Sequence, residues 1–124
     1  MLNFTLLPGS YMIIRLLPGE NIPPWALEGS FYSVTRTPDE LSIVCSSDSV
    51  PQDTPGEGGW SLLKLLGPFP FSTVGVLAEV SNCLSEAGVS LLAISTYDTD
   101  YFLVKEDQLT KALSALGKAG HNQK

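Results

Sequence analysis

The stretch 60–106 constrains the fold of this chain more than any other part of the sequence. It opens with an apolar run, Ser61–Leu66, whose length and composition are typical of a strand, and a loop rich in glycine and proline follows. Thr73–Ala87 carries apolar residues at helical spacing on one face and is followed by a glycine, which often ends a helix. Leu91–Thr96 and Tyr101–Lys105 are again short apolar runs bounded by turn residues. The order strand, helix, strand, strand predicts a small sheet with a helix covering one face.

The first half of the chain repeats part of this pattern. Ile13–Gly19 aligns with Leu62–Pro68 at an offset of 49 positions, with a basic residue at the same place in both segments. Val34–Val44 aligns with Ile94–Val104 at an offset of 60, and each segment joins two apolar runs through a polar turn that ends in a carboxylate. The first half is therefore 11 residues shorter, at the place where the second half has its helix. Self-similarity of this kind predicts two halves built from one duplicated unit.

Four more strands and one short turn are predicted before the central stretch. The strands are Asn3–Leu7, Tyr11–Leu17, Phe31–Arg36 and Leu41–Ser46. Pro23–Glu28 has a proline suited to a helix start but is closed by Gly29 after about one turn, so it is a stub where the second half has a long helix. Asp48–Gly59 has no apolar period and is expected to be a linker without regular structure. Beyond the central stretch, Asp107 is predicted to cap a last helix, and Gly120–Lys124 is expected to be frayed.

This order of elements predicts an α+β fold. It supplies five of the six elements of a ferredoxin-like βαββαβ unit, in which an antiparallel sheet carries its helices on one face. The closing strand is missing from the C-terminus, and Asn3–Leu7 is a candidate to fill that edge. A chain of 124 residues can bury one substantial core but not two independent ones, so we expect the halves to share a surface or a sheet.

The charge and the composition exclude several classes of partner. Seven Lys and Arg against 13 Asp and Glu give a net charge of -6, whereas affinity for nucleic acid comes from basic residues that neutralise phosphates. No run approaches the ~20 apolar residues of a membrane helix, and the N-terminus lacks the features of a secretory signal. We expect a cytoplasmic protein that binds neither nucleic acid nor membrane. Cys45 and Cys83 are then expected to be buried, reduced thiols.

Residues for catalysis or for holding a metal are scarce in this sequence. The one histidine, His121, lies in the segment expected to be frayed, so no triad of serine, histidine and aspartate is predicted. One histidine and two distant cysteines do not supply the three or four ligands of a metal site. No glycine-rich phosphate loop stands between a strand and a helix. We therefore expect no catalytic residue, no metal and no cofactor.

The segment Leu66–Leu77, followed by Ala87-Gly88-Val89 and Ile94-Ser95-Thr96, resembles an ACT domain, a regulatory module that binds amino acids. Ile94–Val104 is similar to the ACT domains of aspartokinases and, more closely, to the paired ACT domains of the cytosolic arginine sensors of animals. The resemblance extends over Phe31–Leu116. The whole chain resembles short stand-alone bacterial proteins with tandem ACT-like halves.

This resemblance implies both a fold and a function. The fold is two ferredoxin-like ACT units in tandem, with a degenerate helix in an N-terminal half over residues 1–50 and an ACT domain over residues 60–120. The function is regulatory or sensory binding of a small amino acid, without chemistry, in a protein expected to be a bacterial homodimer. The alternative is a structural dimerisation module without a working ligand site, because open sheet edges can pair with another chain.

The second half also contains a candidate site for such a ligand. A helix that begins just after a Gly-Pro loop presents unpaired N–H groups and the positive end of its dipole, which suit a carboxylate. Ser72 and Thr73 add hydroxyl donors there, and the carboxylates of the later turn can receive an ammonium or a guanidinium. The candidate ligand-binding residues are Gly67, Phe71, Ser72, Thr73, Ser95, Thr96, Asp98 and Asp100. The same residue types also fit a plain turn, helix caps, ordinary turn carboxylates and strand ends.

Overall fold

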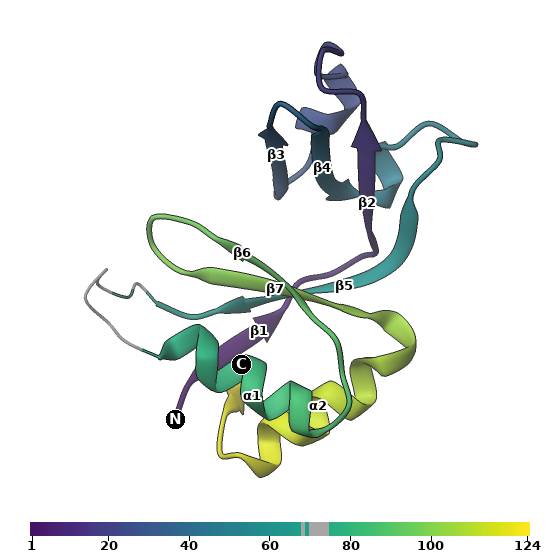
Figure 1. Ribbon diagram of the computed structural model, residues 1–124. Coiled ribbons are helices and arrows are strands. Elements are labelled where there is room, and N and C mark those ends of the chain that lie inside the picture. Colours follow the sequence, from purple (N-terminus) through teal and green to yellow (C-terminus); the bar gives the residue numbers. More distant parts are fainter. Residues whose placement is uncertain (68, 70–74) are drawn as a thin grey trace. The chain divides into compact units, whose positions relative to one another are not determined.

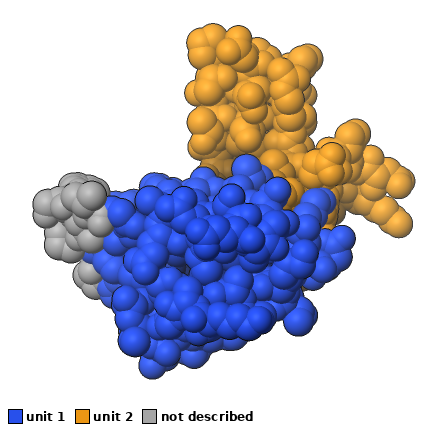
Figure 2. Space-filling model, turned by 60° about the horizontal axis from the view of Figure 1, so that its bottom comes forward, with its two compact units in different colours: residues 1–8, 61–124 blue, residues 9–60 orange. Residues whose placement is uncertain are grey.

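The computed structural model describes residues 1–67, 69 and 75–124, and the chain divides into two compact units (Figure 2). Unit 1 consists of Met1–Pro8 and Ser61–Lys124, and unit 2 consists of Gly9–Trp60. Strand β5 (Glu57–Leu65) contributes its first four residues to unit 2 and the rest to unit 1. The first strand of the chain therefore belongs with the second half of the sequence.

Unit 1 is a sheet with two helices on one face (Figure 1). Its elements are β1 (Asn3–Leu6), the end of β5, α1 (Val76–Glu86), β6 (Leu92–Ser95), β7 (Asp100–Lys105), the 3-10 turn η3 (Glu106–Gln108), α2 (Leu109–Lys118) and β8 (Asn122–Gln123). The strands follow the order β6-β7-β5-β1-β8. β1 runs antiparallel to β5, with Phe4 opposite Leu65, so the first strand does fill the open edge. These elements complete the ferredoxin-like unit, and the predicted α+β fold is confirmed.

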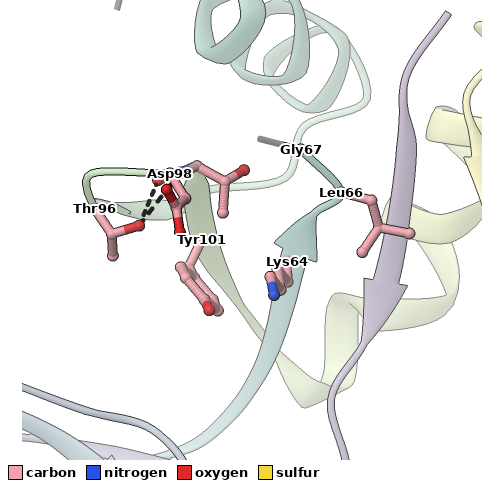
Figure 3. A pocket seen from close by; sticks show the side chains of 7 residues that line it. Lys64, Leu66, Gly67, Thr96, Asp98 and Tyr101 are labelled. Atoms are coloured by element: carbon pink, nitrogen blue, oxygen red, sulfur yellow. Dashed lines mark hydrogen bonds between the residues drawn. The ribbon is translucent and has the colours of Figure 1, made fainter. Parts of the chain in front are cut away.

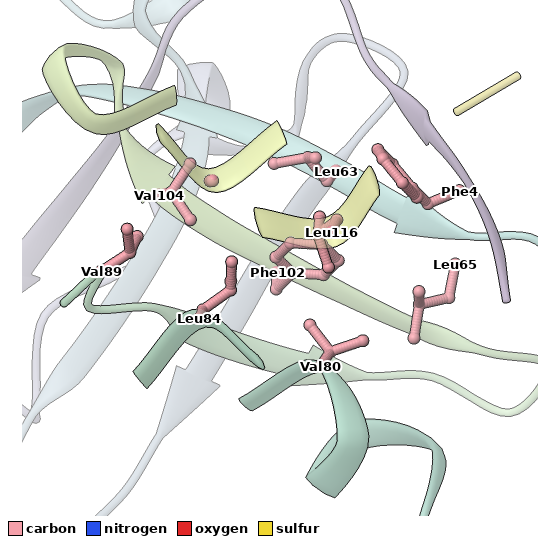
Figure 4. Packing of buried hydrophobic residues seen from close by; sticks show 10 residues of the cluster. Phe4, Leu63, Leu65, Val80, Leu84, Val89, Phe102, Val104 and Leu116 are labelled. Atoms are coloured by element: carbon pink, nitrogen blue, oxygen red, sulfur yellow. The ribbon is translucent and has the colours of Figure 1, made fainter. Parts of the chain in front are cut away.

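The core of unit 1 lies between the sheet and its helices (Figure 4). Every second residue of a strand points to the helices, because successive side chains lie on opposite faces of a sheet. The buried set is Phe4, Leu63, Leu65, Phe102 and Val104 from the strands, with Val80, Leu84, Val89, Ala112 and Leu116 from the helices and their ends. Both cysteines are free thiols, as predicted: Cys45 is buried, whereas Cys83 is only partly covered.

Helix α1 begins directly after Gly75, whose φ of 82° lies in the left-handed region. The predicted first residue of this helix, Thr73, lies outside the described residues. At the other end Gly88 has a φ of 77°, and the Val89 N–H donates back into the last turn at 2.9 Å. This Schellman arrangement confirms the predicted end of the helix. No helix in the described part of the chain is long and apolar enough to cross a membrane.

Unit 2 has a similar strand pattern, but its helices are reduced to single turns. Its elements are β2 (Tyr11–Leu16), η1 (Pro24–Leu27), β3 (Tyr32–Arg36), β4 (Leu41–Ser46), η2 (Ser47–Ser49) and the start of β5. The strands follow the order β3-β4-β2-β5. The predicted stub is confirmed as η1, and its Ala26 is fully buried against Ile14, Ile43 and Cys45.

The linker predicted over Asp48–Gly59 is wrong at both ends. Its first residues belong to η2, and β5 already begins at Glu57. A Cβ on Gly56 would lie 3.0 Å from the carbonyl oxygen of Ile13 in β2. Gly59 has a φ of 76°, and the register between β5 and β2 shifts beside it. The glycines therefore allow a close approach and a bulge within paired strands, which their composition alone does not distinguish from a linker.

The C-terminal residues also differ from the prediction. α2 begins at Leu109, and its N-cap is Gln108 without a side-chain hydrogen bond, so Asp107 is not the cap. β8 pairs in parallel with β1, and the Asn122 N–H donates to the carbonyl oxygen of Leu2 at 2.8 Å. The tail expected to be frayed is an edge strand, because β1 offers it a row of unpaired backbone groups.

The β3–β4 and β6–β7 hairpins close with the same turn. The Thr37 N–H donates to the carbonyl oxygen three residues later at 2.9 Å, and the Thr96 N–H does so at 2.8 Å. Each threonine hydroxyl also forms a hydrogen bond across its own turn. Equivalent turn positions are therefore 59 apart, one fewer than the predicted offset of 60. This alignment makes Asp39 the counterpart of Asp98.

Candidate functional site

A pocket of about 250 Å³ opens in unit 1 between the end of β5 and the β6–β7 hairpin (Figure 3). Its lining residues are Lys64, Leu66 and Gly67 from the β5 side, and Thr96, Asp98, Thr99 and Tyr101 from the hairpin. All seven belong to unit 1. We call this the β5–hairpin pocket.

The β5–hairpin pocket lies on the face of the sheet that α1 and α2 do not cover. Leu65 and Phe102 point into the core under the helices. Neighbours along a strand point to opposite faces, so Lys64 and Tyr101 point away from the helices. The Nζ atom of Lys64 lies 5.9 Å from the centre of the Tyr101 ring.

Hydrogen bonds tie the hairpin turn to the end of β5. Thr99 is 7% exposed and donates its hydroxyl to the carbonyl oxygen of Leu65 at 2.7 Å. The Phe69 N–H donates to the carbonyl oxygen of Asp98 at 2.9 Å. Thr96 closes the turn itself, as the dashed lines in Figure 3 show. The floor of the pocket is therefore formed by the fold and does not need a ligand to order it.

Among its described lining residues, the β5–hairpin pocket has one cationic and one anionic side chain, Lys64 and Asp98. Asp98 is exposed at the turn, and Leu66 and Tyr101 add an aliphatic side chain and an aromatic ring to the lining. The ammonium of Lys64 can donate a charge-assisted hydrogen bond to a carboxylate of a ligand. The carboxylate of Asp98 can accept one from an ammonium of a ligand. None of the described lining residues is a histidine or a cysteine. The described lining therefore offers a donor for a carboxylate and an acceptor for an ammonium.

The structure separates the residues that the sequence analysis grouped as one site. Gly67, Thr96 and Asp98 line the pocket. Ser95 and Asp100 do not: they face each other on β6 and β7, and the Ser95 hydroxyl donates to a carboxylate oxygen of Asp100. Asp100 lies two residues before Phe102, which is buried under the helices, so the side chain of Asp100 is on the helix-covered face. The remaining candidates, Phe71, Ser72 and Thr73, lie outside the described residues.

Four lining residues were missed by the sequence analysis. They are Lys64, Leu66, Thr99 and Tyr101. Lys64 had one signal, the basic residue shared with Arg15 in the repeat, but a single shared charge does not indicate a ligand site. Thr99 and Tyr101 flank Asp100, which was a predicted site residue. Because side chains alternate along a strand, Thr99 and Tyr101 lie on the opposite face of the sheet from Asp100.

A second hollow of about 520 Å³ lies between α1 and α2. His121, which is 4% exposed, accepts the Leu2 N–H at its Nδ1 atom at 3.1 Å, so in the neutral ring Nε2 carries the proton and lies 3.5 Å from Oε1 of Glu79. Burial, together with the charges of Glu86 and Glu79, raises the pKa of the nearby Cys83 thiol. A protonated thiol is a poor nucleophile. Among the described residues no group of three His, Cys, Asp or Glu could hold a metal.

Comparison with known families agrees with this architecture. A family model described as an ACT domain matches residues 56–118, and a second model, of an N-terminal domain, matches residues 9–53. A solved protein from Agrobacterium tumefaciens is 44% identical, with a TM-score of 0.93 over 99% of this chain and 92% of that one. The aspartate kinase of Clostridium acetobutylicum is 14% identical, with a TM-score of 0.69 over 94% of this chain and 33% of that one, which shows a likeness of fold alone.

A curated relative is the cytosolic arginine sensor for mTORC1 subunit 1 of Bos taurus. It is 26% identical over 99 residues, which cover 71% of this chain and 30% of the sensor. This chain therefore spans less than a third of the length of that relative. The resemblance inferred from Leu66–Leu77 and the segments after it is confirmed by the family model, which covers just over half of the chain. The chain belongs to the ACT domain family.

Proposed function

We propose that this protein binds a small amino acid in the β5–hairpin pocket and acts as a regulatory or sensory protein without catalysing a reaction. The observation that carries the proposal is the placement of Lys64 and Asp98 at one pre-formed pocket. The Lys64 ammonium suits the α-carboxylate of an amino acid, and the Asp98 carboxylate suits its α-ammonium. The side chain of the ligand then lies along Leu66 and Tyr101.

The family and one relative support an amino acid as the ligand. The curated relative is named an arginine sensor, and the aspartate kinase with the same fold is described as an allosteric enzyme. This chain covers only 30% and 33% of those two proteins. The proposal therefore takes the class of ligand from the family and the arginine sensor, and takes neither the activity nor the partners of either protein.

The proposal includes the organisation of the chain. Unit 2 is the degenerate ACT-like domain of the N-terminal half, with η1 and η2 in place of helices, and residues 60–120 form the ACT domain that binds the ligand. We further propose a homodimer in a bacterial cytoplasm, without a nucleic-acid partner because the net charge is -6. Binding regulates such a protein only if the ligand favours one assembly over another.

Thermal unfolding in the presence of each of the twenty amino acids tests the proposal. A ligand that binds only the folded state stabilises it by about 2.7 kcal/mol at 100 times its Kd. We expect a raised unfolding temperature with one amino acid or a few related ones. No shift with any of them would contradict the proposal.

Two matched variants of the β6–β7 hairpin locate the site. Asp98→Asn is expected to weaken binding at least about tenfold, because a hydrogen bond to a charged group contributes about 1.5–3 kcal/mol. Asp100→Asn makes the same change of charge outside the pocket and is expected to bind as the wild type does. Loss of binding in Asp100→Asn but not in Asp98→Asn would place the ligand elsewhere.

One feature favours the alternative, a dimerisation module without a ligand site. Within the described sheet β6 pairs only with β7, and Leu92 on β6 is 41% exposed. An exposed apolar edge strand is a template for a strand of another chain, and lysine at such an edge opposes pairing. If β6 is the interface, Leu92→Lys lowers the molar mass found by sedimentation from dimer to monomer. An unchanged mass would exclude this edge as the interface.

A further inference from the structure

The duplicated unit allows the β5–hairpin pocket to be compared with its counterpart in unit 2. Arg15 of β2 lies opposite Ser42 of β4, and Lys64 of β5 lies beside Tyr101 of β7. Lys64 follows Arg15 by the 49 positions of the first alignment, and Tyr101 follows Ser42 by the 59 positions of the hairpin turn. The two pairs therefore occupy equivalent places in the two units.

The charged groups of Arg15 and Lys64 lie at different places in the two units. In unit 2 the Nη2 atom of Arg15 donates to the carbonyl oxygen of Asp39 at 3.0 Å and so spans from β2 to the hairpin turn. In unit 1 the corresponding carbonyl, that of Asp98, accepts a backbone N–H instead. Lys64 holds its ammonium 5.9 Å from the centre of the Tyr101 ring. Arg15 reaches from β2 to Asp39 in unit 2. The equivalent residues in unit 1, Lys64 and Asp98, both line the β5–hairpin pocket.

The residue types at these places explain the difference. Arginine presents a planar fork of donors, whereas lysine is a compact charge on a flexible stem. The negative face of an aromatic ring attracts a nearby cation. Tyr101 provides such a ring, and Ser42 at the equivalent place does not. Lysine with tyrosine, in unit 1, keeps the cation beside the tyrosine ring. Arginine with serine, in unit 2, lets the cation reach across to the hairpin turn.

We infer that Lys64 and Tyr101 keep the β5–hairpin pocket open and that Arg15 closes its counterpart, so that the chain binds one ligand, in unit 1. The stoichiometry rests on the proposed function. The placement of the guanidinium groups does not depend on it and can be measured without a ligand.

Lys64→Arg tests the placement by nuclear magnetic resonance. The chain contains only two arginines, so a third guanidinium is resolved readily after labelling arginine with 15N. In Lys64→Arg the new guanidinium is expected to show slowed rotation and slowed hydrogen exchange, as Arg15 does, and Arg15→Lys identifies the Arg15 signal. Lys111→Arg, on the exposed side of α2, is the matched control with a freely rotating group. Equal mobility of the guanidinium in Lys64→Arg and Lys111→Arg would overturn the inference.

Calorimetric titration then uses the amino acid that raises the unfolding temperature of the wild type. We expect one ligand per chain, at least about tenfold weaker binding in Lys64→Arg, and unchanged binding in Lys111→Arg. The double variant Arg15→Lys, Ser42→Tyr is expected to approach two ligands per chain. Two ligands per wild-type chain, or unchanged binding in a Lys64→Arg protein with a fixed guanidinium, overturns this inference and leaves the proposed function standing. If no amino acid binds the wild type, the proposed function fails and the one-ligand stoichiometry fails with it.

Discussion

At Gly67 the backbone lies so close to Phe69 and to the hairpin turn that a Cβ would be crowded from both sides. A Cβ here would lie 2.9 Å from the nitrogen of Phe69 and 3.2 Å from the carbonyl oxygen of Asp98, the two atoms joined by a hydrogen bond. These are backbone atoms and cannot move aside as the end of a flexible side chain does. Position 67 therefore requires glycine, because the hydrogen bond between Phe69 and Asp98 in the floor of the pocket leaves little room for a Cβ.

Gly67→Ala is expected to destabilise the protein by roughly 1–3 kcal/mol, because overpacking forces the backbone to shift. It is also expected to weaken ligand binding, since the shift opens the bond that holds the turn. Unfolding in urea measures the first effect. The control is Gly117→Ala in α2, where nothing lies within 4 Å and alanine is expected to stabilise the helix by about 0.5–1 kcal/mol. Equal stability of Gly67→Ala and the wild type would contradict this account of the floor.

At the scale of elements, β1 and β8 show how far pairing departs from chain order. β1 comes first in the chain, yet it lies between β5, which leaves unit 2 and enters unit 1, and β8, which comes last in the chain. Asn122 and Lys124 each donate a backbone N–H at 2.8 Å, to the carbonyl oxygens of Leu2, which directly precedes β1, and of Phe4 within β1. His121 adds its Nδ1 atom as an acceptor for the Leu2 N–H. The C-terminal residues therefore hold the first strand from its outer side.

Removing residues 122–124 is expected to lower the free energy of unfolding by about 1–3 kcal/mol, because two backbone hydrogen bonds contribute about 0.5–1.5 kcal/mol each. Unfolding in urea measures this loss. The control is the double variant Asn122→Ala, Gln123→Ala, which keeps the backbone and changes only exposed side chains, so its effect is expected to stay within about 0.5 kcal/mol. A truncated chain as stable as the full chain would show that β8 adds nothing to the sheet.

At the scale of the whole molecule, the two units differ in the size of their cores. Unit 1 buries residues from three strands, β1, β5 and β7, and from two helices around one cluster. The cluster under η1 in unit 2 has only four buried members: Ile14, Ala26, Ile43 and Cys45. The fourth strand of unit 2 is the start of β5, which continues into unit 1. Small chains bury a small fraction of their surface, so we expect unit 2 to be the less stable of the two.

A fragment of residues 9–60 is expected to be unfolded by itself, because its core is small and the fragment cuts β5 after its first four residues. Circular dichroism of the fragment on heating, beside the full chain as a control, checks this. A cooperative unfolding transition of the isolated fragment would show that unit 2 does not need the rest of the chain.

The sequence by itself determined the local elements and the family. The hairpins, the helix that ends before Gly88 and the stub at Pro24–Leu27 were predictable because each is encoded by side-chain periodicity and turn residues within a few positions. The tertiary structure alone decided the pairing of β1 and β8, the start of β5 at Glu57 and the grouping of Lys64 with Asp98 in one pocket. These features depend on which distant segments of backbone pair and on which side chains of a strand point away from the core. A one-residue change of register moves every side chain of a strand to the other face, so the local sequence does not decide them.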